Sequence, residues 1–158
     1  MALDAFVNDR IFSKIGIADG SWAKDAAGNV IAPGGLYLSP RSMLRVGRLV
    51  RNGGTWNGTV VVSAAWVGAS STQPSGSQCY SYLWWLGRSG CSPSTPLFAT
   101  PGPIESFYAA GWGGNYVNAI PSKGLVGVRM KDAATSTYEV MKLTAFESFP
   151  GELVKIAP

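Results

Sequence analysis

Two cysteines are the residues of this chain whose type and spacing most directly suggest covalent chemistry. Cys79 and Cys91 are its only cysteines, and it contains no histidine. They bracket a predicted strand and the turn Gly87-Arg88-Ser89-Gly90, so they could form a disulfide across a hairpin or stay two buried free thiols. A disulfide would indicate the periplasm or secretion, and free thiols would fit the cytoplasm. Without histidine, most zinc and haem ligand sets are excluded, and we expect no metal and no cofactor.

A second unusual region is the glycine-rich stretch Gly111-Trp112-Gly113-Gly114, which lies between predicted strands. The strand pattern covers four segments, residues 80–86, 106–112, 115–120 and 125–130. Strands in this order form an antiparallel meander. A final helix over about residues 137–149 carries apolar residues at helical spacing and should pack on one face of that sheet.

The first part of the chain shows helical rather than strand-like spacing. Apolar residues predict a helix from about Leu3 to Ser13 that stops at Gly16. The stretch from Ala18 to Gly35 is rich in glycine and alanine and predicts a long loop. Loops of this length in compact domains are often functional.

The second predicted helix has the clearest boundaries. Ser39 is a typical N-cap, Pro40 suits the first helical position, and Gly53-Gly54 ends the helix. Inside it, Gly47 costs roughly 1 kcal/mol relative to alanine, so we expect close packing there against another element. A short third helix begins near Ser63. Together these elements predict an α+β fold, an antiparallel sheet with flanking helices.

Composition supports a single domain over residues 1–158, with a helical part over about 1–72 and the sheet plus C-terminal helix over about 78–158. The apolar fraction is 46% and the charged fraction 14%, which can supply a core. Four arginines, at positions 41, 45, 48 and 51, fall on one helix face; with no nucleic-acid motif beside them, we interpret that face as solvated and expect no nucleic-acid partner. No apolar run is long enough to cross a membrane. The first residues enter an amphipathic helix directly, which suggests a start inside a domain.

Several segments together resemble one family of enzymes. They are residues 32–39 running into 43–49, residues 52–58 before Ala65-Trp66-Val67, the aromatic strand 80–86, and Ala109-Ala110-Gly111-Trp112-Gly113-Gly114 with the strands that follow. In this order they resemble the C-terminal part of the serine hydrolase superfamily that contains class C β-lactamases, penicillin-binding proteins and esterases. The resemblance covers nearly the whole chain, but only part of a full family domain, and it implies a partial β-lactamase/transpeptidase-like fold.

The resemblance also implies a substrate-binding strand. Enzymes of this family acylate a serine in a Ser-x-x-Lys motif and carry a third motif of Lys-Thr-Gly type on a sheet strand. Trp112-Gly113-Gly114 occupies the place of that third motif, and the backbone N–H of Asn115 would be one oxyanion donor. Glycines would leave the strand edge open to substrate. Because tryptophan cannot supply the charge of the lysine, esters or amides are favoured over β-lactams.

A Ser-x-x-Lys match is present at Ser21-Trp22-Ala23-Lys24, but its context is wrong. The nucleophile of the family starts a long buried helix, whereas Ser21 and Lys24 lie in a predicted loop. A second match, to the Tyr-x-Asn pattern of the family, is Tyr116-Val117-Asn118; alternation puts both side chains on one sheet face as packing residues.

Our prediction is therefore a C-terminal segment of a β-lactamase-related serine hydrolase, acting on a small acyl substrate, whose nucleophile-bearing part is missing or carried by another chain. The chain alone should be inactive, and a second copy or a complementary chain carrying the Ser-x-x-Lys part is the expected partner. One alternative is a non-catalytic ligand-binding or assembly module derived from that fold. Another is an aromatic-rich carbohydrate-binding domain that uses Trp84, Trp85 and Trp112 as stacking faces.

Overall fold

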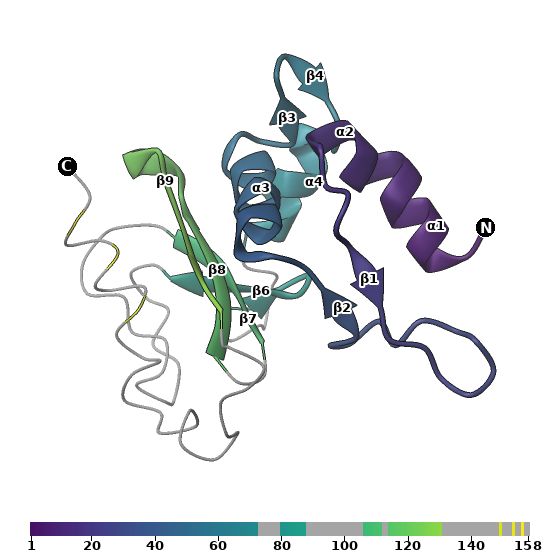
Figure 1. Ribbon diagram of the computed structural model, residues 1–158. Helices are drawn as coiled ribbons and strands as arrows, with labels where there is room; N and C mark the ends of the chain where they lie inside the picture. The colour runs from purple at the N-terminus through teal and green to yellow at the C-terminus, as the bar shows by residue number, and fades with distance from the viewer. Residues whose placement is uncertain are drawn as a thin grey trace.

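The centre of the molecule is a five-stranded antiparallel sheet (Figure 1). The computed structural model describes residues 1–72, 80–87, 106–111 and 114–130, and the single residues 149, 153 and 156. The strands follow one another in chain order: β5 (Tyr80–Ser81), β6 (Trp84–Gly87), β7 (Ser106–Gly111), β8 (Asn115–Ile120) and β9 (Leu125–Arg129). This is the predicted meander. With the helices beside it, it confirms the α+β fold class.

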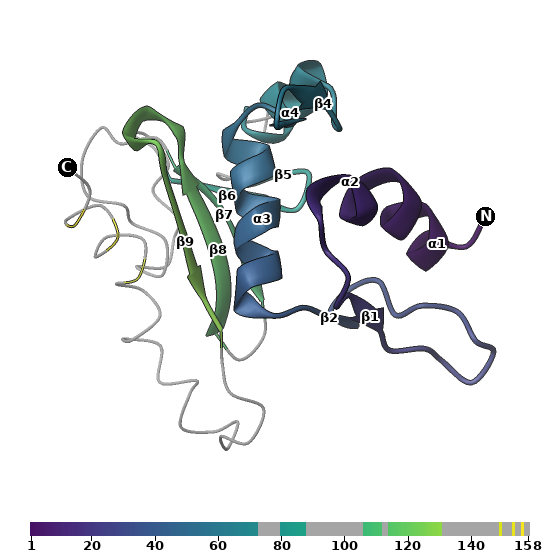
Figure 2. The same ribbon diagram turned by 45° about the horizontal axis from the view of Figure 1, so that its top comes forward.

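One face of the sheet is covered by the helix α3 (Pro40–Arg51), as Figures 1 and 2 both show. The contact is closest at Gly47: a Cβ atom added there would lie 2.5 Å from Val126 Cγ1 and 2.7 Å from Val117 Cγ2. The expectation that Gly47 packs closely against another element is confirmed. Beside it, Val50 of α3 packs against the buried side chains of Leu86, Phe107 and Ala119.

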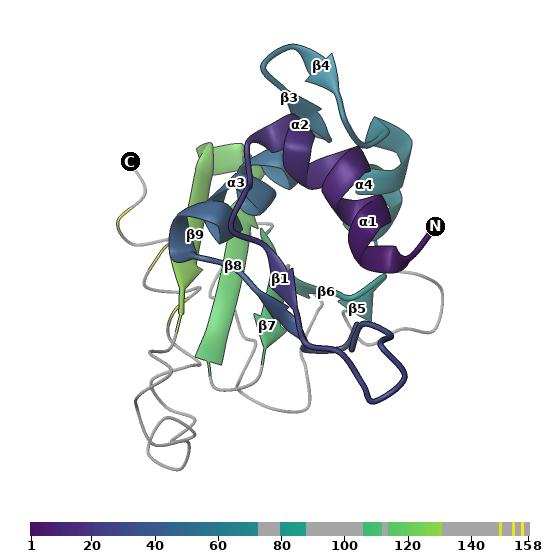
Figure 3. The same ribbon diagram turned by 45° about the vertical axis from the view of Figure 1, so that its right-hand side comes forward.

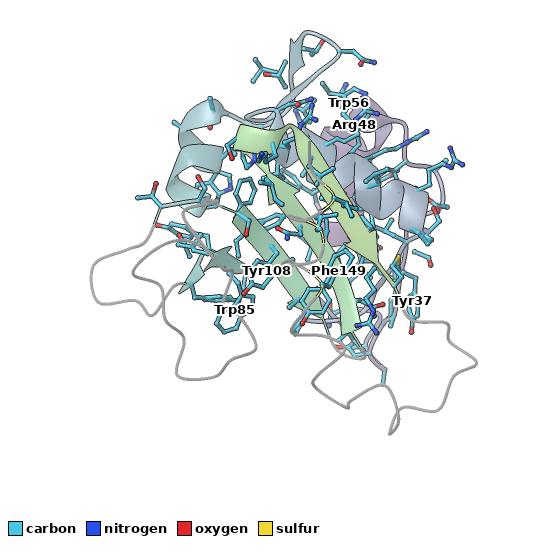
Figure 4. The ribbon with its side chains drawn as sticks, turned by 90° about the vertical axis from the view of Figure 1, so that its left-hand side faces the viewer. Tyr37, Arg48, Trp56, Trp85, Tyr108 and Phe149 are labelled. Atoms are coloured by element: carbon cyan, nitrogen blue, oxygen red, sulfur yellow. The ribbon has the colours of Figure 1, made fainter. Side chains whose placement is uncertain are left out.

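The opposite face of the sheet carries residues from the C-terminal end of the chain. Leu153 packs against Gly127 of β9, and the ring of Phe149 lies 6.0 Å from that of Tyr116. Figure 4 views this face, with Tyr108 and Phe149 labelled. Phe149 is helical in the structure, but the rest of the predicted 137–149 helix lies outside the described residues.

The predicted first helix is present, but its middle is π-helical. It consists of α1 (Leu3–Val7), the π-helical stretch η1 (Asn8–Phe12) and α2 (Ser13–Ile15), and it ends at Gly16 with φ of +72°. Its buried residues meet α3 in a second core, separate from the sheet, made of Phe12, Ile15, Ile17 and Leu49. Helix α3 therefore has one core on each side.

Two small ribbons and one further helix complete the described part. The pair β1 (Ser21–Trp22) and β2 (Leu36–Tyr37) lies within and just after the stretch predicted as a long loop, and β3 (Thr55–Trp56) pairs with β4 (Thr59–Val60). The loop prediction for 18–35 was therefore wrong in part. Helix α4 (Ala64–Ser70) starts where predicted, because the Ser63 hydroxyl accepts a hydrogen bond from Trp66 N. A 3₁₀ turn, η4 (Pro121–Lys123), joins β8 to β9.

The strand predicted over residues 80–86 is in fact a hairpin. Tyr82 and Leu83, between β5 and β6, have φ values of +42° and +73°. Both side chains are exposed. Turns of this kind are usually made by asparagine or glycine, which adopt positive φ at little cost. Tyr82 and Leu83 are bulky and give no such turn signal, so the sequence pattern predicted one continuous strand where the structure has a turn.

The start of α3 is held by two side chains. Ser39 is the N-cap, as predicted, and its hydroxyl accepts from Ser42 N at 3.2 Å. The Asp19 carboxylate accepts from Ser39 N at 3.0 Å and from the Ser42 hydroxyl at 2.5 Å. These hydrogen bonds from Ser39 and then Ser42 lower the pKa of Asp19 from 3.8 to about 2. Asp19 thereby ties the segment after α2 to the start of α3.

The lowered pKa of Asp19 predicts an acid-dependent loss of stability. A carboxyl group whose folded-state pKa lies below its unfolded value stabilises the fold above the unfolded pKa, and this contribution is lost as pH falls toward the folded pKa. We expect Asp19→Asn to lower the urea midpoint at pH 5 and to make little difference at pH 2. Urea unfolding followed by circular dichroism at pH values from 5 to 2 measures the midpoints of the wild type and the variant. Wild-type and variant midpoints that stay the same distance apart from pH 5 to pH 2 would contradict the assignment.

Candidate functional site

The glycine-rich hairpin joins two central strands of the sheet. Gly111 at the end of β7 pairs with Asn115 at the start of β8. Between them, Gly114 is buried and has φ of +88°, a backbone conformation that glycine adopts without strain. Trp112 and Gly113 lie outside the described residues. The hairpin predicted from the glycines is present, and Asn115 begins an interior strand that has β7 on one side and β9 on the other.

The side of β7 that faces β6 is covered along only half of its length. Strand β6 pairs with Ser106, Phe107 and Tyr108 and makes no further pair with β7. On the β6 side, the stretch from Ala109 to Gly111 therefore has no strand partner within the part of the chain that the structure describes. We call these three residues the open edge of β7. An extended segment could add to such an edge through main-chain hydrogen bonds.

Small side chains keep the open edge accessible. Ala109 and Ala110 are half-buried, and Gly111 is exposed. On Gly111 an added Cβ atom would have only ordinary contacts, 3.6 Å from Asn115 Cβ and O, and its φ lies outside the left-handed region. A side chain at this position therefore projects without disturbing the hairpin, in contrast to one at Gly114.

Ser21 and Lys24 do not form the start of a helix. Ser21 lies on β1 opposite Tyr37, and Lys24 forms an isolated bridge with Val30. A spacing of three brings two side chains to one face on a helix but not on extended backbone. The Lys24 ammonium instead binds Asp4 Oδ2 at 3.0 Å, and this contact holds the pKa of Asp4 below its usual value.

The Tyr-x-Asn match lies where alternation predicted, on a buried sheet face. Tyr116 is 3% exposed and Asn118 is fully buried, on the face that also carries Phe149. Tyr108, paired with Asn118 across the strands, is buried as well, and this burial raises the pKa of its phenol far above the ordinary value. A phenol that is so difficult to ionise is a poor general base.

The arginines of α3 connect it to its neighbours. Arg48 lies over the ring of Trp56, 5.0 Å from its centroid, and Arg51 donates to the carbonyl of Gly124. Figure 4 labels Arg48 and Trp56 side by side. Arg45 makes a long contact with the carbonyl of Ile15. Arg41 makes no hydrogen bond, ion pair or cation–π contact within the part of the chain that the structure describes. Arg41 and Arg48 are exposed, as expected for a solvated face, whereas Arg45 and Arg51 are half-buried.

The remaining predictions concern the two cysteines, metal ligands and membrane-spanning helices. Cys79 and Cys91 lie outside the described residues, so their pairing stays a prediction. Within the residues that the structure describes, no three His, Cys, Asp or Glu side chains form a group that could hold a metal. In the same part of the chain, no helix is both long and apolar enough to span a bilayer.

The open edge was not located by the sequence alone. The strand ending at Gly111 was predicted, but where β6 stops pairing with it depends on the turn at Tyr82 and Leu83. The run of small residues Ala109-Ala110-Gly111 could have pointed to it, since small residues in a strand often mark the close approach of another backbone.

Comparison with solved structures identifies the fold. A provisionally assigned 6-aminohexanoate-dimer hydrolase from Bacillus anthracis is similar over 100% of this chain and 40% of its own, with a TM-score of 0.72 and 20% identity. A provisionally assigned β-lactamase from Bacteroides dorei DSM 17855 is similar over 89% of this chain and 50% of its own, with a TM-score of 0.54 and 11% identity. The chain thus spans half or less of the length of these structures, and it shares their α+β, β-lactamase-like fold.

No known protein-family profile matches the sequence. No curated protein matches it either.

Proposed function

We propose that this chain is the C-terminal segment of a β-lactamase-related serine hydrolase and that it supplies the substrate-binding side of an acyl-transfer site. The observation that carries the proposal is the open edge of β7, residues Ala109–Gly111, which runs directly into the Trp112-Gly113-Gly114 hairpin. The shared fold of two hydrolase-type structures supports it.

The chemistry that fits this edge is acylation by an ester or amide. An extended substrate would pair with the main chain of residues 109–111 on the β6 side of β7, and its carbonyl carbon would then lie beside the turn that follows Gly111. There the N–H of Asn115 is proposed to stabilise the oxyanion of the tetrahedral intermediate. With a tryptophan where the family motif has lysine, no charge is supplied for a β-lactam carboxylate. The amide substrate named for the Bacillus anthracis structure is in keeping with this class.

The nucleophile is proposed to come from a part of the enzyme that this chain does not contain. Within the described residues, the Ser-x-x-Lys spacing occurs at Ser21, which lies on extended backbone, and its Lys24 is bound to Asp4. A charged ammonium held by a carboxylate is not available to accept the proton of a serine. A complementary polypeptide with Ser-x-x-Lys at a helix start is the proposed partner.

The proposal predicts that this chain alone does not turn over a chromogenic β-lactam or a short p-nitrophenyl ester. Without a nucleophile, an edge strand and one oxyanion donor only position the substrate. Absorbance assays of the purified chain and of Ser21→Ala test this. Turnover that Ser21→Ala abolishes would refute the proposal and make Ser21 the nucleophile.

The positive test uses the assembled enzyme. We expect co-expression with a Ser-x-x-Lys polypeptide encoded beside this chain to give esterase or amidase activity. In that assembly Gly111→Val should lower the rate of acylation by on the order of 100-fold, because it displaces substrate from the open edge. Gly111→Ala is the matched control and should have a much smaller effect. Full activity in Gly111→Val, with unchanged circular dichroism, would show that the edge does not bind substrate.

Gly114, the other glycine of this hairpin that the structure describes, does not suit this test. Its φ of +88° would strain any L-residue, so a loss of activity in Gly114→Val could reflect local misfolding. Gly111 has no such restriction, which makes it the more informative site.

A further inference from the structure

A cleft of about 420 Å³ lies between the first helix and the segment that follows it, outside the proposed acyl-transfer site. The helix contributes Asp4, Asn8 and Phe12, and the other wall contributes Ser21, Trp22 and Lys24. In the three ribbon views, β1 lies beside and below the first helix (Figures 1 to 3). The volume of the cleft is in the lower part of the range of small-molecule sites.

The helix wall of the cleft is irregular. Asn8 and Phe12, the first and last residues of the π-helical stretch η1, both line the cleft. Single π-helical turns inside α-helices are rare and frequently occur at functional sites. Here the wider turn coincides with the wall of a cleft, so two independent features indicate the same place.

The charges of the cleft cancel each other. Lys24 Nζ lies 3.0 Å from Asp4 Oδ2, with the two side chains 51% and 26% exposed. The hydrogen bond from Lys24 keeps the pKa of Asp4 low, so the carboxylate is charged at neutral pH and the pair has no net charge. An anion or a cation in the cleft would have to compete with this pair for its partner.

The neutral groups of the cleft are available for a ligand. Within the described residues, the Asn8 amide and the Ser21 hydroxyl make no side-chain hydrogen bond, and both residues are exposed. Trp22 is half-buried, so part of its ring offers apolar surface beside these polar groups, whereas Phe12 is buried in the second core. Tryptophan combines a large apolar face with one N–H donor.

We propose that this cleft binds a small neutral molecule with one apolar face and several hydroxyl or amide groups, the chemistry of a pyranose sugar. The apolar face would stack on Trp22, and the hydroxyl or amide groups would bind Asn8 and Ser21. The Asp4–Lys24 pair, already neutralised, would supply further hydrogen bonds without selecting an ion. This also gives Ser21 and Lys24 a role in which neither acts as a nucleophile or a base.

Ligand-observed NMR and calorimetry on the purified chain test this, with N-acetylglucosamine and methyl glucoside as neutral probes and acetate and ethylammonium as charged ones. We expect saturable binding of at least one neutral probe, weakened about tenfold by Trp22→Ala, equivalent to about 1.4 kcal/mol. Trp66→Ala, which removes an exposed tryptophan on α4, is the matched control and should bind as wild type.

A second variant keeps the test decisive if Trp22→Ala fails to fold. Ser21→Ala removes one exposed hydroxyl and is expected to weaken binding about threefold, equivalent to about 0.6 kcal/mol. Absence of binding by both neutral probes, binding unchanged in both variants, or preferential binding of a charged probe would each overturn the proposal. Because binding is measured and not turnover, the result is independent of the proposed hydrolase function.

Discussion

Replacing Gly54 by alanine is expected to leave the chain largely unfolded at 37 °C. Gly54 follows α3, is buried and has φ of +84°, and a Cβ atom there would lie 2.0 Å from the carbonyl oxygen of Val62. Val61 N and Val62 N both donate hydrogen bonds to the carbonyl of Gly54. The backbone of Gly54 therefore cannot move away from Val62 without losing these bonds. A clash with main chain, added to left-handed strain, places this change among those costing about 4 kcal/mol or more. Typical domains have only about 5–15 kcal/mol in total.

Gly58→Ala is the matched control for Gly54→Ala. Gly58 lies in the β3–β4 turn with φ of +81°, but a Cβ atom there meets nothing within 4 Å. It therefore carries the left-handed strain without the clash, and we expect it to cost only about 1–2 kcal/mol. Urea unfolding of both variants, followed by circular dichroism, separates the two contributions. Equal losses in the two variants would show that the contact with Val62 is relieved at little cost.

The second large effect is expected at Gly47, where alanine should destabilise the chain although alanine is the better helix former. Its Cβ atom would lie under 3.0 Å from methyl groups of both Val117 and Val126. Because valine side chains are short and stiff, the helix must move away from the sheet, and overpacking of this kind costs about 1–3 kcal/mol. The gain in helix propensity recovers about 1 kcal/mol at most.

Gly68→Ala provides the opposite result on the same chain. Gly68 lies inside α4, and an added Cβ atom there has no neighbour within 4 Å. We expect it to raise the free energy of unfolding by about 0.5–1 kcal/mol through helix propensity alone. Chemical denaturation of the two variants in parallel tests the pair. A Gly47→Ala variant as stable as Gly68→Ala would mean that α3 lies farther from the sheet than described.

The regular part of the fold was predictable because its signals are local. Ser39 and Pro40 specify the start of α3 through their own backbone preferences, and period-two patterns with intervening turns specify β7, β8 and β9. These signals need no information from distant parts of the chain. The tightness of the contact at Gly47 was also indicated, since a glycine inside a helix needs a packing reason.

Features that depend on tertiary context were missed or only partly predicted. The turn at Tyr82 and Leu83 uses residues that avoid positive φ, so the hairpin it makes is imposed by the surrounding fold. The open edge of β7 exists only because β6 ends its pairing at Tyr108. The register between two strands cannot be predicted from the sequence of either strand alone. The cleft between Asn8 and Trp22 likewise joins segments whose proximity no local pattern gives.

The position of α3 between two cores has a consequence for how the chain folds. The sheet strands are neighbours in sequence and close through short turns wherever the structure describes their connections, so hairpins such as β8–β9 can form early and quickly. By contrast, Gly47 meets Val117 and Val126, about seventy to eighty positions away along the chain. Docking of α3 onto the finished sheet closes that large loop and joins the two cores in one event. We therefore expect it to be the slow step of folding, with the second core, made of Phe12, Ile15, Ile17 and Leu49, ordering only once the helix has docked.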